Sequence, residues 1–343
     1  MTVSFIIPAY NANKTINRCL ESIYSLGLPE NDYEIIIIDD ASTDNTTDIV
    51  QNHLNTHDNV TLLRQCENHR QGAARNRGIT VAKGEFIVFV DSDDEVDRGL
   101  TRALQLAANN NLDMVAMRYA KVGKEGKTDE EVVLPYEQDK VFNGIEMQTE
   151  FAFWCTAPWA YVYRKAFLFE VKYPFAENVL FEDSDFVNIH LFYAGRMSYC
   201  DDCCYLVHFN ETSTTHTNSF KHVCDYAILG NRMITFYQNQ IEDKSTKYAE
   251  IILEGGSYNI MRSCRNLFKL ESIKDVQSFY LRFDQFCDRK KLTGYRKPAY
   301  CWNRWTRFCI KHKTLTTLLV GAVLSTHVLD IKKAINKKCL FRK

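Results

Sequence analysis

Apolar runs of strand length alternate with helix-like patterns through the first hundred residues, and this alternation limits the folds open to the chain. Four runs rich in β-branched and aromatic residues read as buried strands, at 4–8, 33–38, 60–63 and 86–90. Helical spacing of apolar residues follows at 15–26, from about Thr46 or Thr47, and at 72–81. Strands that alternate with helices of this length build a parallel sheet with right-handed crossovers. The sequence therefore predicts an α/β fold with a Rossmann-like, doubly wound and mostly parallel sheet.

Three regions of different character follow one another along the 343 residues, a length sufficient for two domains. The α/β pattern continues more loosely after residue 97, with a helix expected at 100–109, a strand at 113–122 and a charged loop or hairpin at 123–139. The patterns predict an α/β domain over 1–215, a helical extension over 216–288 and a basic amphipathic tail over 289–343.

Carboxylates stand directly after two of the predicted strands. Asp39 and Asp40 follow the second strand, and the acids of the segment DSDD, namely Asp91, Asp93 and Asp94, follow the run FIVFV. Carboxyl ends of parallel strands share one edge of a sheet, and ligands bind in the crevice outside it. Oxygen ligands suit Mg²⁺ or Mn²⁺ bridging carboxylates to a phosphate. The alternative is a solvated turn in which Asp and Ser bond their own backbone.

Charge is distributed unevenly along the chain. From residue 289 onward there are 15 Lys and Arg residues and one acid, Asp330, which leaves 27 basic and 42 acidic residues in 1–288. Tryptophans interleave with this basic charge, and the uncharged run at 314–329 is shorter than the roughly 20 residues that span a bilayer. We expect a peripheral helix on an anionic membrane surface. A packed helical subdomain is the alternative, and nucleic-acid binding is disfavoured because no recognised motif accompanies the charge.

The cysteines and the N-terminus indicate where the chain resides. Met1 leads directly into a strand, and no basic segment or small-residue cleavage site precedes it, so we expect a cytoplasmic protein with reduced thiols, on the inner face of the cell membrane. One cluster has the spacing of half a zinc site, formed by Cys200, Cys203, Cys204 and His208. A second ligand pair is missing, which disfavours zinc.

Four segments in order resemble the signatures of the inverting family 2 glycosyltransferases with a GT-A fold, of the type that builds bacterial surface polysaccharide. The segments are SFIIPAYNANKTINRCLESI, EIIIIDDASTDNT, GAARNRGITVAKGEFIVFVDSDD and FEDSDF. Each is weak alone, and four with compatible separations make a specific signal over about residues 2–210. The resemblance implies that a sugar moves from a nucleotide sugar, usually a UDP-sugar, to an acceptor hydroxyl with inversion at the anomeric carbon.

The resemblance also implies roles for individual residues. It makes Asp183 the catalytic base, Asp93 and Asp91 ligands of Mn²⁺ or Mg²⁺, and His208 a further candidate ligand. It predicts that the acceptor, a glycan or lipid-linked oligosaccharide, contacts Glu182 and an aromatic wall that contains Trp154 and Trp159. The residues expected at the donor are Pro8, Tyr10, Asn11, Asp39, Asp40, Arg75 and Asp91.

Structural alternatives stay open for most of these residues. Tyr10, Trp159 and His208 would serve equally as core residues, and Arg75 as a solvated surface charge. Glu182 and Asp183 would stabilise a helix N-terminus whatever their chemistry. Two other functions compete: a sugar nucleotidyltransferase, which needs a glycine-rich phosphate loop that PAYNANKT lacks, and an inactive membrane-tethered module, which the intact acids argue against.

Overall fold

The computed structural model describes residues 2–134, 136–137, 139–151, 155–210, 219–267, 270, 272–286, 309, 311–317 and 320. The chain divides into two compact units, Met1–Ser213 and Thr214–Lys343. The predicted limits at 215 and 288 remain predictions, and each unit is described separately below.

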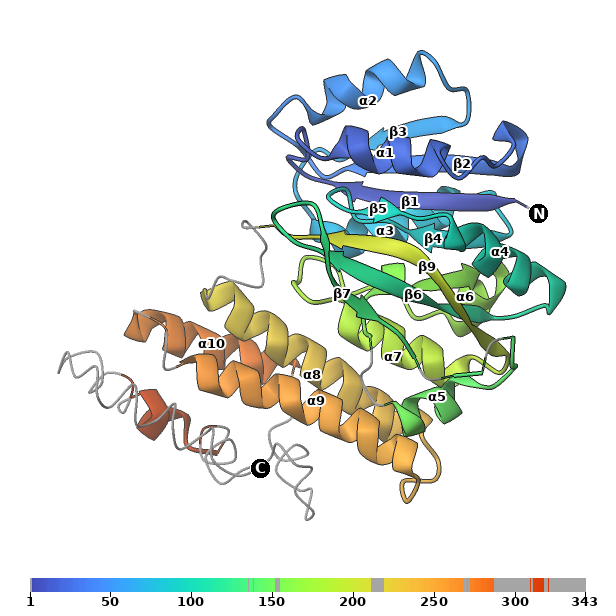
Figure 1. Ribbon diagram of the computed structural model, residues 1–343. Helices are drawn as coiled ribbons and strands as arrows, with labels where there is room; N and C mark the ends of the chain where they lie inside the picture. The colour runs from blue at the N-terminus through green and yellow to red at the C-terminus, as the bar shows by residue number, and fades with distance from the viewer. Residues whose placement is uncertain are drawn as a thin grey trace. The chain divides into compact units, whose positions relative to one another are not determined.

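The first half of the sheet has the predicted parallel strands and crossover helices (Figure 1). The parallel strands have the spatial order β3-β2-β1-β4 and are β1 (Val3–Ala9), β2 (Tyr33–Asp39), β3 (Val60–Arg64) and β4 (Phe86–Phe89). The helices between them are α1 (Ile16–Tyr24), α2 (Thr46–Leu54) and α3 (Arg70–Val81), with a short 3₁₀ turn at Glu30–Asp32. Strands β1, β2 and β4 are mostly apolar and largely buried because helices cover both faces, whereas the edge strand β3 is only partly buried. The predicted α/β class is confirmed.

The second half of the sheet is mixed. Strand β4 pairs antiparallel with β8 (Tyr161–Arg164), which pairs antiparallel with β6 (Met114–Val122). The long β9 (Met197–His208) runs parallel to β6 and pairs antiparallel with the short β5 (Glu95–Val96). The predicted charged hairpin contains β7 (Thr128–Val132), which pairs antiparallel with β6. Strand β9 thus returns to the segment that directly follows the DSDD acids.

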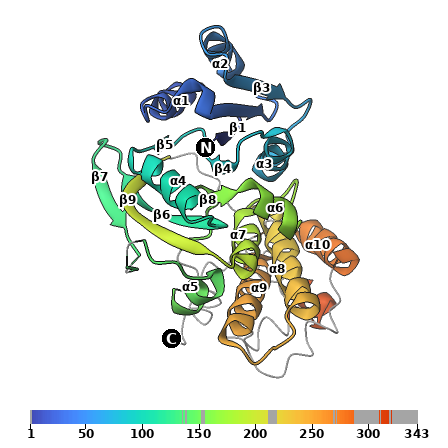
Figure 2. The same cartoon turned by 90° about the vertical axis from the view of Figure 1, so that its right-hand side faces the viewer.

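Helices cover the two faces of this sheet, and each face has its own apolar core (Figure 2). One core contains side chains of α1, α2 and α4 (Gly99–Asn109), such as Leu20, Val50 and Leu104. The other contains side chains of α3, of α6 (Lys165–Val171) and of α7 (Asp183–Tyr193), such as Ala74, Phe167 and Phe186. Helix α5 (Gly144–Glu150) and the 3₁₀ turn Pro158–Ala160 complete the unit. This arrangement fixes α3 and α7, which carry Arg75 and Asp183, on the same face.

The described part of the second unit is helical, as predicted for 216–288. Its helices are α8 (Phe220–Gln240), α9 (Lys247–Asn266) and α10 (Ile273–Phe286), which share an apolar core. Two described residues of the tail, Cys309 and Val320, are fully buried in this core, and Tyr280 donates a hydrogen bond to the Cys309 carbonyl. At these positions the tail is packed rather than exposed. Residues 311–315 are exposed, Thr316 is buried and Thr317 is partly buried. The other residues of the predicted membrane-binding tail lie outside the described residues.

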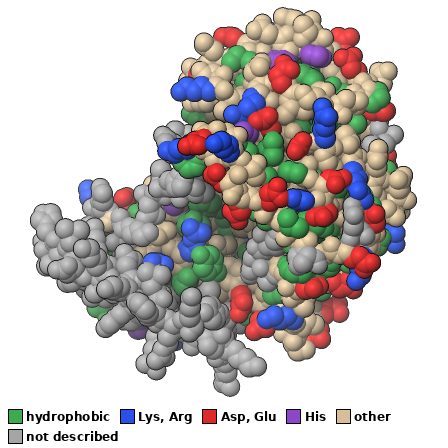
Figure 3. All heavy atoms as spheres, in the orientation of Figure 1, with side chains coloured by type: hydrophobic (Ala, Val, Ile, Leu, Met, Phe, Trp, Pro, Cys, Tyr) green, Lys and Arg blue, Asp and Glu red, His purple; other side chains and the backbone are tan. Residues whose placement is uncertain are grey.

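Two observations bear on the membrane and charge predictions. Within the described ranges, no helix combines the length and apolar character needed to cross a bilayer. On the face shown in Figure 3, Asp and Glu side chains are interspersed with Lys and Arg over the first unit. The basic excess is therefore a property of the tail and does not extend across this face.

Candidate active site

The loops that follow β1 and β2 are bonded to each other at the carboxyl edge of the sheet. The Asn11 N–H donates to Ser42 Oγ at 2.9 Å, and Asn11 Oδ1 accepts from the Thr43 N–H at 2.8 Å. Asn11 has a φ of 51°, a left-handed conformation that Asn tolerates better than most residues. The Asn11 side-chain oxygen, predicted to meet the donor, is therefore used to join the two loops.

Tyr10 and Pro8 differ in their access to this edge. Tyr10 is 49% exposed at the end of β1, so its ring is free to stack on a ligand. Pro8 is buried inside β1 in register with Ile38, and the strand continues to Ala9. The first strand, predicted to end at Pro8, continues to Ala9 because the pairing with β2 persists past the proline. The contact of Pro8 with the donor stays a prediction.

The two acids after β2 have different environments. Asp40 is buried and accepts hydrogen bonds from the N–H groups of His69 (2.8 Å) and Arg70 (2.7 Å) and from Gln65 Nε2 (2.7 Å). Its carboxylate therefore anchors the loop that leads into α3. Each of its oxygens already accepts at least one hydrogen bond, and donor binding by Asp40 stays a prediction.

Asp39 keeps one oxygen without a hydrogen bond. Its side chain is wholly buried, and Oδ1 accepts from the Ser42 N–H at 3.3 Å. Oδ2 has no hydrogen-bond partner among the described residues, although Arg64 Nε lies 3.7 Å away. A buried carboxylate oxygen is normally hydrogen-bonded, so an unmet acceptor points to a ligand donor.

The DSDD segment forms a tight turn in which the acids face different partners. The Asp94 N–H donates to the Asp91 carbonyl at 3.0 Å. Asp94 is buried, and its carboxylate accepts from Tyr205 Oη at 3.1 Å and from the His208 N–H at 2.8 Å. Burial raises the pKa of Asp94, and the neighbouring acids Asp91 and Asp93 raise it further. Asp94 thus fastens the turn to β9, and this leaves Asp91 and Asp93 as the acids presented to a ligand.

Arg75 joins this turn to the acids that open α7. The guanidinium is buried; its Nη2 lies 2.8 Å from Asp91 Oδ1 and its Nη1 lies 2.6 Å from Glu182 Oε1. Its Cζ also lies 5.4 Å from the centre of the Phe175 ring. The charge of Arg75 is held between two carboxylates, and Glu182 is buried against it. The predicted contacts of Arg75 with the donor and of Glu182 with the acceptor stay predictions.

Asp183 is the first residue of α7 and lies beside this bridge. Burial raises the pKa of Asp183 to about 7, and the charges of Glu182 and Asp91 act in the same direction, while Arg75 opposes them. The loop before it has left-handed backbone at Asn178 (φ 58°) and Phe181 (φ 65°). These conformations are costly for a residue such as Phe, and they cluster at functional sites.

The aromatic side of the site contains Trp159. This side chain is half-buried and stacks on Tyr205 with ring centres 4.6 Å apart. It also forms a T-shaped pair with Tyr119, with ring centres 4.9 Å apart. The charge of Asp183 acts on the neighbouring Cys155, which places this segment near the predicted base. Trp154 lies outside the described residues, and its role at the acceptor stays a prediction.

The predicted metal ligands form an oxygen donor set of modest size. Asp91 keeps Oδ2 beyond its bond to Arg75, and Asp93 Oδ2 accepts from Asn210 Nδ2 at 2.7 Å. His208 Nε2 lies 2.6 Å from Glu95 Oε1, so its ring is held by Glu95. Across the described ranges, no three His, Cys, Asp or Glu side chains gather as a metal cluster. Two carboxylates still fit Mg²⁺ or Mn²⁺, because these ions take their remaining ligands from phosphate and water.

The cysteines near His208 do not converge on a zinc ion. Cys200 Sγ contacts the Gly99 carbonyl, Cys203 Sγ the Tyr205 carbonyl and Cys204 Sγ the Asp202 carbonyl. The Cys200 thiol thus contacts α4, whereas the other two thiols contact carbonyls of β9.

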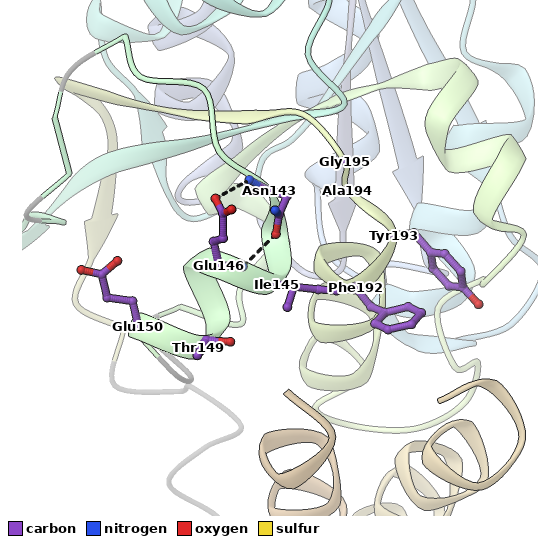
Figure 4. A pocket seen from close by; sticks show the side chains of 9 residues that line it. All are labelled: Asn143, Ile145, Glu146, Thr149, Glu150, Phe192, Tyr193, Ala194 and Gly195. Atoms are coloured by element: carbon purple, nitrogen blue, oxygen red, sulfur yellow. Dashed lines mark hydrogen bonds between the residues drawn. The ribbon is translucent and has the colours of Figure 1, made fainter. Parts of the chain in front are cut away.

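A separate open pocket of about 820 Å³ lies between α5 and the end of α7 (Figure 4). Its lining includes Ile145, Glu146 and Tyr193. Asp183 begins α7 and Tyr193 ends it, and a helix rises about 1.5 Å per residue. The pocket is therefore distinct from the acid site.

Sequence patterns did not single out Tyr205, Tyr119 or Glu95. Tyr205 follows a cysteine cluster within an ordinary strand, and its importance comes from its contact with a turn 111 residues earlier. No local signal marks such a contact.

Comparisons with known proteins relate the first part of the chain to a family. The family model for glycosyl transferase family 2 matches residues 4–169. A poly(ribitol-phosphate) beta-glucosyltransferase of Bacillus spizizenii is 37% identical over 37% of this chain and 20% of that protein. An uncharacterized glycosyltransferase of Escherichia coli, YibD, is 30% identical over 62% of this chain and 63% of that protein. The chain thus spans less than two thirds of the length of these curated relatives.

A solved structure shows the same fold. The crystal structure of Staphylococcus aureus TarS 1–349 in complex with UDP-GlcNAc covers 95% of this chain and 91% of that chain, with a TM-score of 0.66 and 19% identity. This likeness establishes the GT-A fold and agrees with the predicted α/β class. Together with the family match, it shows that residues 4–169 belong to a glycosyl transferase family 2 domain and that the fold is GT-A.

Proposed function

We propose that the chain is an inverting, metal-dependent glycosyltransferase that moves a sugar from a UDP-sugar to an acceptor hydroxyl. The observation that carries the proposal is the buried Arg75 bridge, which brings the Asp91 end of the DSDD turn and the Glu182–Asp183 pair into one site. A solvated turn and a separate charged helix start, the structural alternatives, would not share a buried guanidinium.

The donor would bind at the carboxyl edge of the parallel strands. Asp39 Oδ2 would accept a hydrogen bond from the uracil imide or a ribose hydroxyl, and the exposed Tyr10 would stack on the base. Asp91 and Asp93 would hold Mn²⁺ or Mg²⁺ at the diphosphate. When bound, this ion supplies Lewis-acid stabilisation of the charge on the leaving group. A neighbour of the same fold, TarS, was crystallised with UDP-GlcNAc, which supports a UDP-sugar here.

Asp183 would take the proton of the acceptor hydroxyl. As its carboxylate accepts the proton, the acceptor oxygen attacks the anomeric carbon from the face opposite UDP, and the bond to the diphosphate breaks. A base is most effective when its pKa lies near the working pH, and the raised pKa of about 7 suits Asp183 to this step. Glu182 and Arg75 would act through Asp183 by fixing its charge environment.

The acceptor would lie against Trp159, whose partly open ring suits the apolar face of a sugar. Relatives named as poly(ribitol-phosphate) glycosyltransferases support a bacterial surface polymer or a lipid-linked oligosaccharide as the acceptor. We extend the proposal to the cytoplasmic face of the membrane, where residues 289–343 would contact anionic lipid through their basic side chains.

Nucleotide binding tests the donor site directly. With Mn²⁺, we expect one member of a panel of UDP-sugars and other nucleotide sugars to bind and to hydrolyse slowly. Asp93→Ala should weaken the affinity for UDP by on the order of 100-fold in Mn²⁺ and leave it unchanged in EDTA, because the lost carboxylate acts through the ion. Calorimetric titrations under both conditions measure this difference.

The control is Asp202→Ala, which removes an exposed aspartate of β9 and should not alter UDP binding in either buffer. A wild-type chain that binds no nucleotide in Mn²⁺ would reject the proposed function. If Asp93→Ala weakened the affinity for UDP equally in Mn²⁺ and in EDTA, only the metal role of Asp93 would be rejected.

A further inference from the structure

We infer that Tyr205 is a positioning residue that links the two halves of the site: its hydroxyl holds the donor turn and its ring supports the acceptor wall. The inference rests on the proposed function, since it concerns how that site keeps its shape. It assigns a role to a side chain that neither the motifs nor the family match marks out.

The hydroxyl of Tyr205 makes two hydrogen bonds, both with the DSDD turn. Tyr205 Oη accepts from the Asp91 N–H at 3.0 Å and donates to Asp94 Oδ2 at 3.1 Å. A buried tyrosine needs only one partner, and here both bonds go to the first and last residues of one turn. The side chain is fully buried, so water does not replace these bonds when they are lost. Tyr205 therefore sets the backbone position of Asp91 from behind.

The ring of Tyr205 packs against the indole of Trp159. The two rings are stacked at 4.6 Å with an interplanar angle of 8°, so one face of the indole is covered by Tyr205. Tyr205 lies in register with Val96 on β5 and with Tyr119 on β6, and Tyr119 also forms a T-shaped pair with the indole. The position of Trp159 is thus defined by residues of the same sheet that carries the acid turn.

Other groups also support the turn, among them Cys19, whose Sγ contacts the Asp91 carbonyl at 3.7 Å. Arg18 Nη2 donates to the Asp93 carbonyl at 2.6 Å, and the His208 N–H donates to Asp94 at 2.8 Å. The contacts of Arg18 and His208 hold the middle and the end of the turn, whereas the backbone N–H of Asp91, the acid that Arg75 binds, donates to Tyr205. Loss of the Tyr205 hydroxyl should therefore act on Asp91 first.

Two substitutions separate the hydroxyl from the ring. Tyr205→Phe removes the hydroxyl and should weaken the affinity for UDP in Mn²⁺ by about fivefold to tenfold, with the Trp159 emission unchanged. Tyr205→Leu removes both groups and should weaken UDP binding as well as shift the Trp159 emission to the red, because the indole loses its stacked partner. The chain has four tryptophans, so the Trp159 signal is obtained by subtracting the spectrum of Trp159→Phe.

The matched control is Tyr199→Phe. Tyr199 is a fully buried tyrosine of the same strand whose Oη accepts from the Leu134 N–H at 3.0 Å, remote in sequence from the acid turn. It should lose thermal stability much as Tyr205→Phe does and keep the wild-type affinity for UDP. A general weakening of the sheet would affect UDP binding in both variants alike.

The outcomes distinguish this inference from the proposed function. If the wild-type chain binds UDP in Mn²⁺ and Tyr205→Phe binds it within twofold of wild type, the positioning role fails and the proposed function stands. The positioning role fails in the same way if Tyr205→Phe and Tyr199→Phe weaken binding equally. If Tyr205→Leu leaves the Trp159 emission unchanged, the support of the acceptor wall fails. A wild-type chain that binds no nucleotide overturns both.

Discussion

Asp183→Asn is expected to lower the turnover of sugar transfer by roughly 1,000-fold while leaving UDP affinity within about twofold. A positioned general base contributes on the order of 100-fold to 10,000-fold, and an amide of the same size cannot accept the proton. UDP binding should survive because the donor residues Asp39 and Asp93 belong to other elements. Single-turnover transfer and calorimetric UDP titration measure the two quantities separately.

The pH dependence of the wild-type rate gives a second expectation for Asp183. Its carboxylate must be ionised to act as a base, and its pKa is raised to about 7. The value of kcat/KM should therefore fall about tenfold per pH unit below pH 7 and level off above it. A rate that is flat between pH 5 and 8 would contradict the assignment of Asp183 as the base.

Asp183→Asn should also stabilise the fold. A carboxyl whose pKa is raised in the folded state binds its proton more tightly there than in the unfolded chain, so ionising it costs folding free energy. This cost is fully present above pH 7 and disappears as the pH falls toward the ordinary Asp value of about 4. Asp183→Asn should gain more than about 1 kcal/mol at pH 8 and progressively less at pH 5, measured by urea unfolding.

Asp48→Asn is the matched control, since Asp48 is an exposed aspartate in the first turn of α2. It should change stability by only a few tenths of a kcal/mol and leave transfer intact. If both variants transferred sugar at the wild-type rate, the charged helix start would be the correct interpretation of Glu182 and Asp183.

Local hydrophobic patterns in the sequence predicted the first half of the fold well. The runs 33–38 and 86–90 are buried on both faces, and only a covered parallel strand explains an unbroken apolar segment of that length. Both strands end in acids at the same edge, as expected. The order of the second half was not predictable, because β8 inserts between β4 and β6 through antiparallel pairs that no local signal marks.

Side-chain partners in the site were predictable only where the motif itself contains them. Asp40 and Asp39 look alike in sequence, and they differ because the loop at His69 and Arg70 consumes only one carboxylate. Arg75 looks like a surface residue of a polar helix, yet Glu182, 107 residues later, buries it. Such pairings depend on which helices share a face of the sheet, and that information lies in the tertiary fold.

Arg75→Met is expected to destabilise the first unit by about 3–5 kcal/mol at pH 8. Removing one partner of a buried ion pair leaves the other charges without compensation, and here two carboxylates, Asp91 and Glu182, lose the same cation. Burial already raises the pKa of both, and Arg75 is the charge that opposes this rise. The pKa values of Asp91 and Glu182 should rise further in Arg75→Met.

The loss of folding stability in Arg75→Met should therefore become smaller as the pH falls. As the pH falls, the uncompensated carboxyls take up protons and their buried charge disappears, so Arg75→Met should approach wild-type stability near pH 5. Urea unfolding at pH 5 and pH 8 measures the difference. Arg77→Met removes an exposed arginine of the same helix and should show less than about 0.5 kcal/mol of change at either pH.

A lysine at the same position separates charge from shape. Arg75→Lys keeps one positive charge but cannot donate to both carboxylates in the planar fork that a guanidinium offers, so we expect it to restore part of the stability and less of the transfer rate. Because Arg75 lowers the pKa of Asp183, Arg75→Met should also shift the rate profile to higher pH, whereas Arg75→Lys should shift it less. If Arg75→Met left both the unfolding curve and the rate profile unchanged, the bridge between the donor turn and the base would not be the element that unites the site.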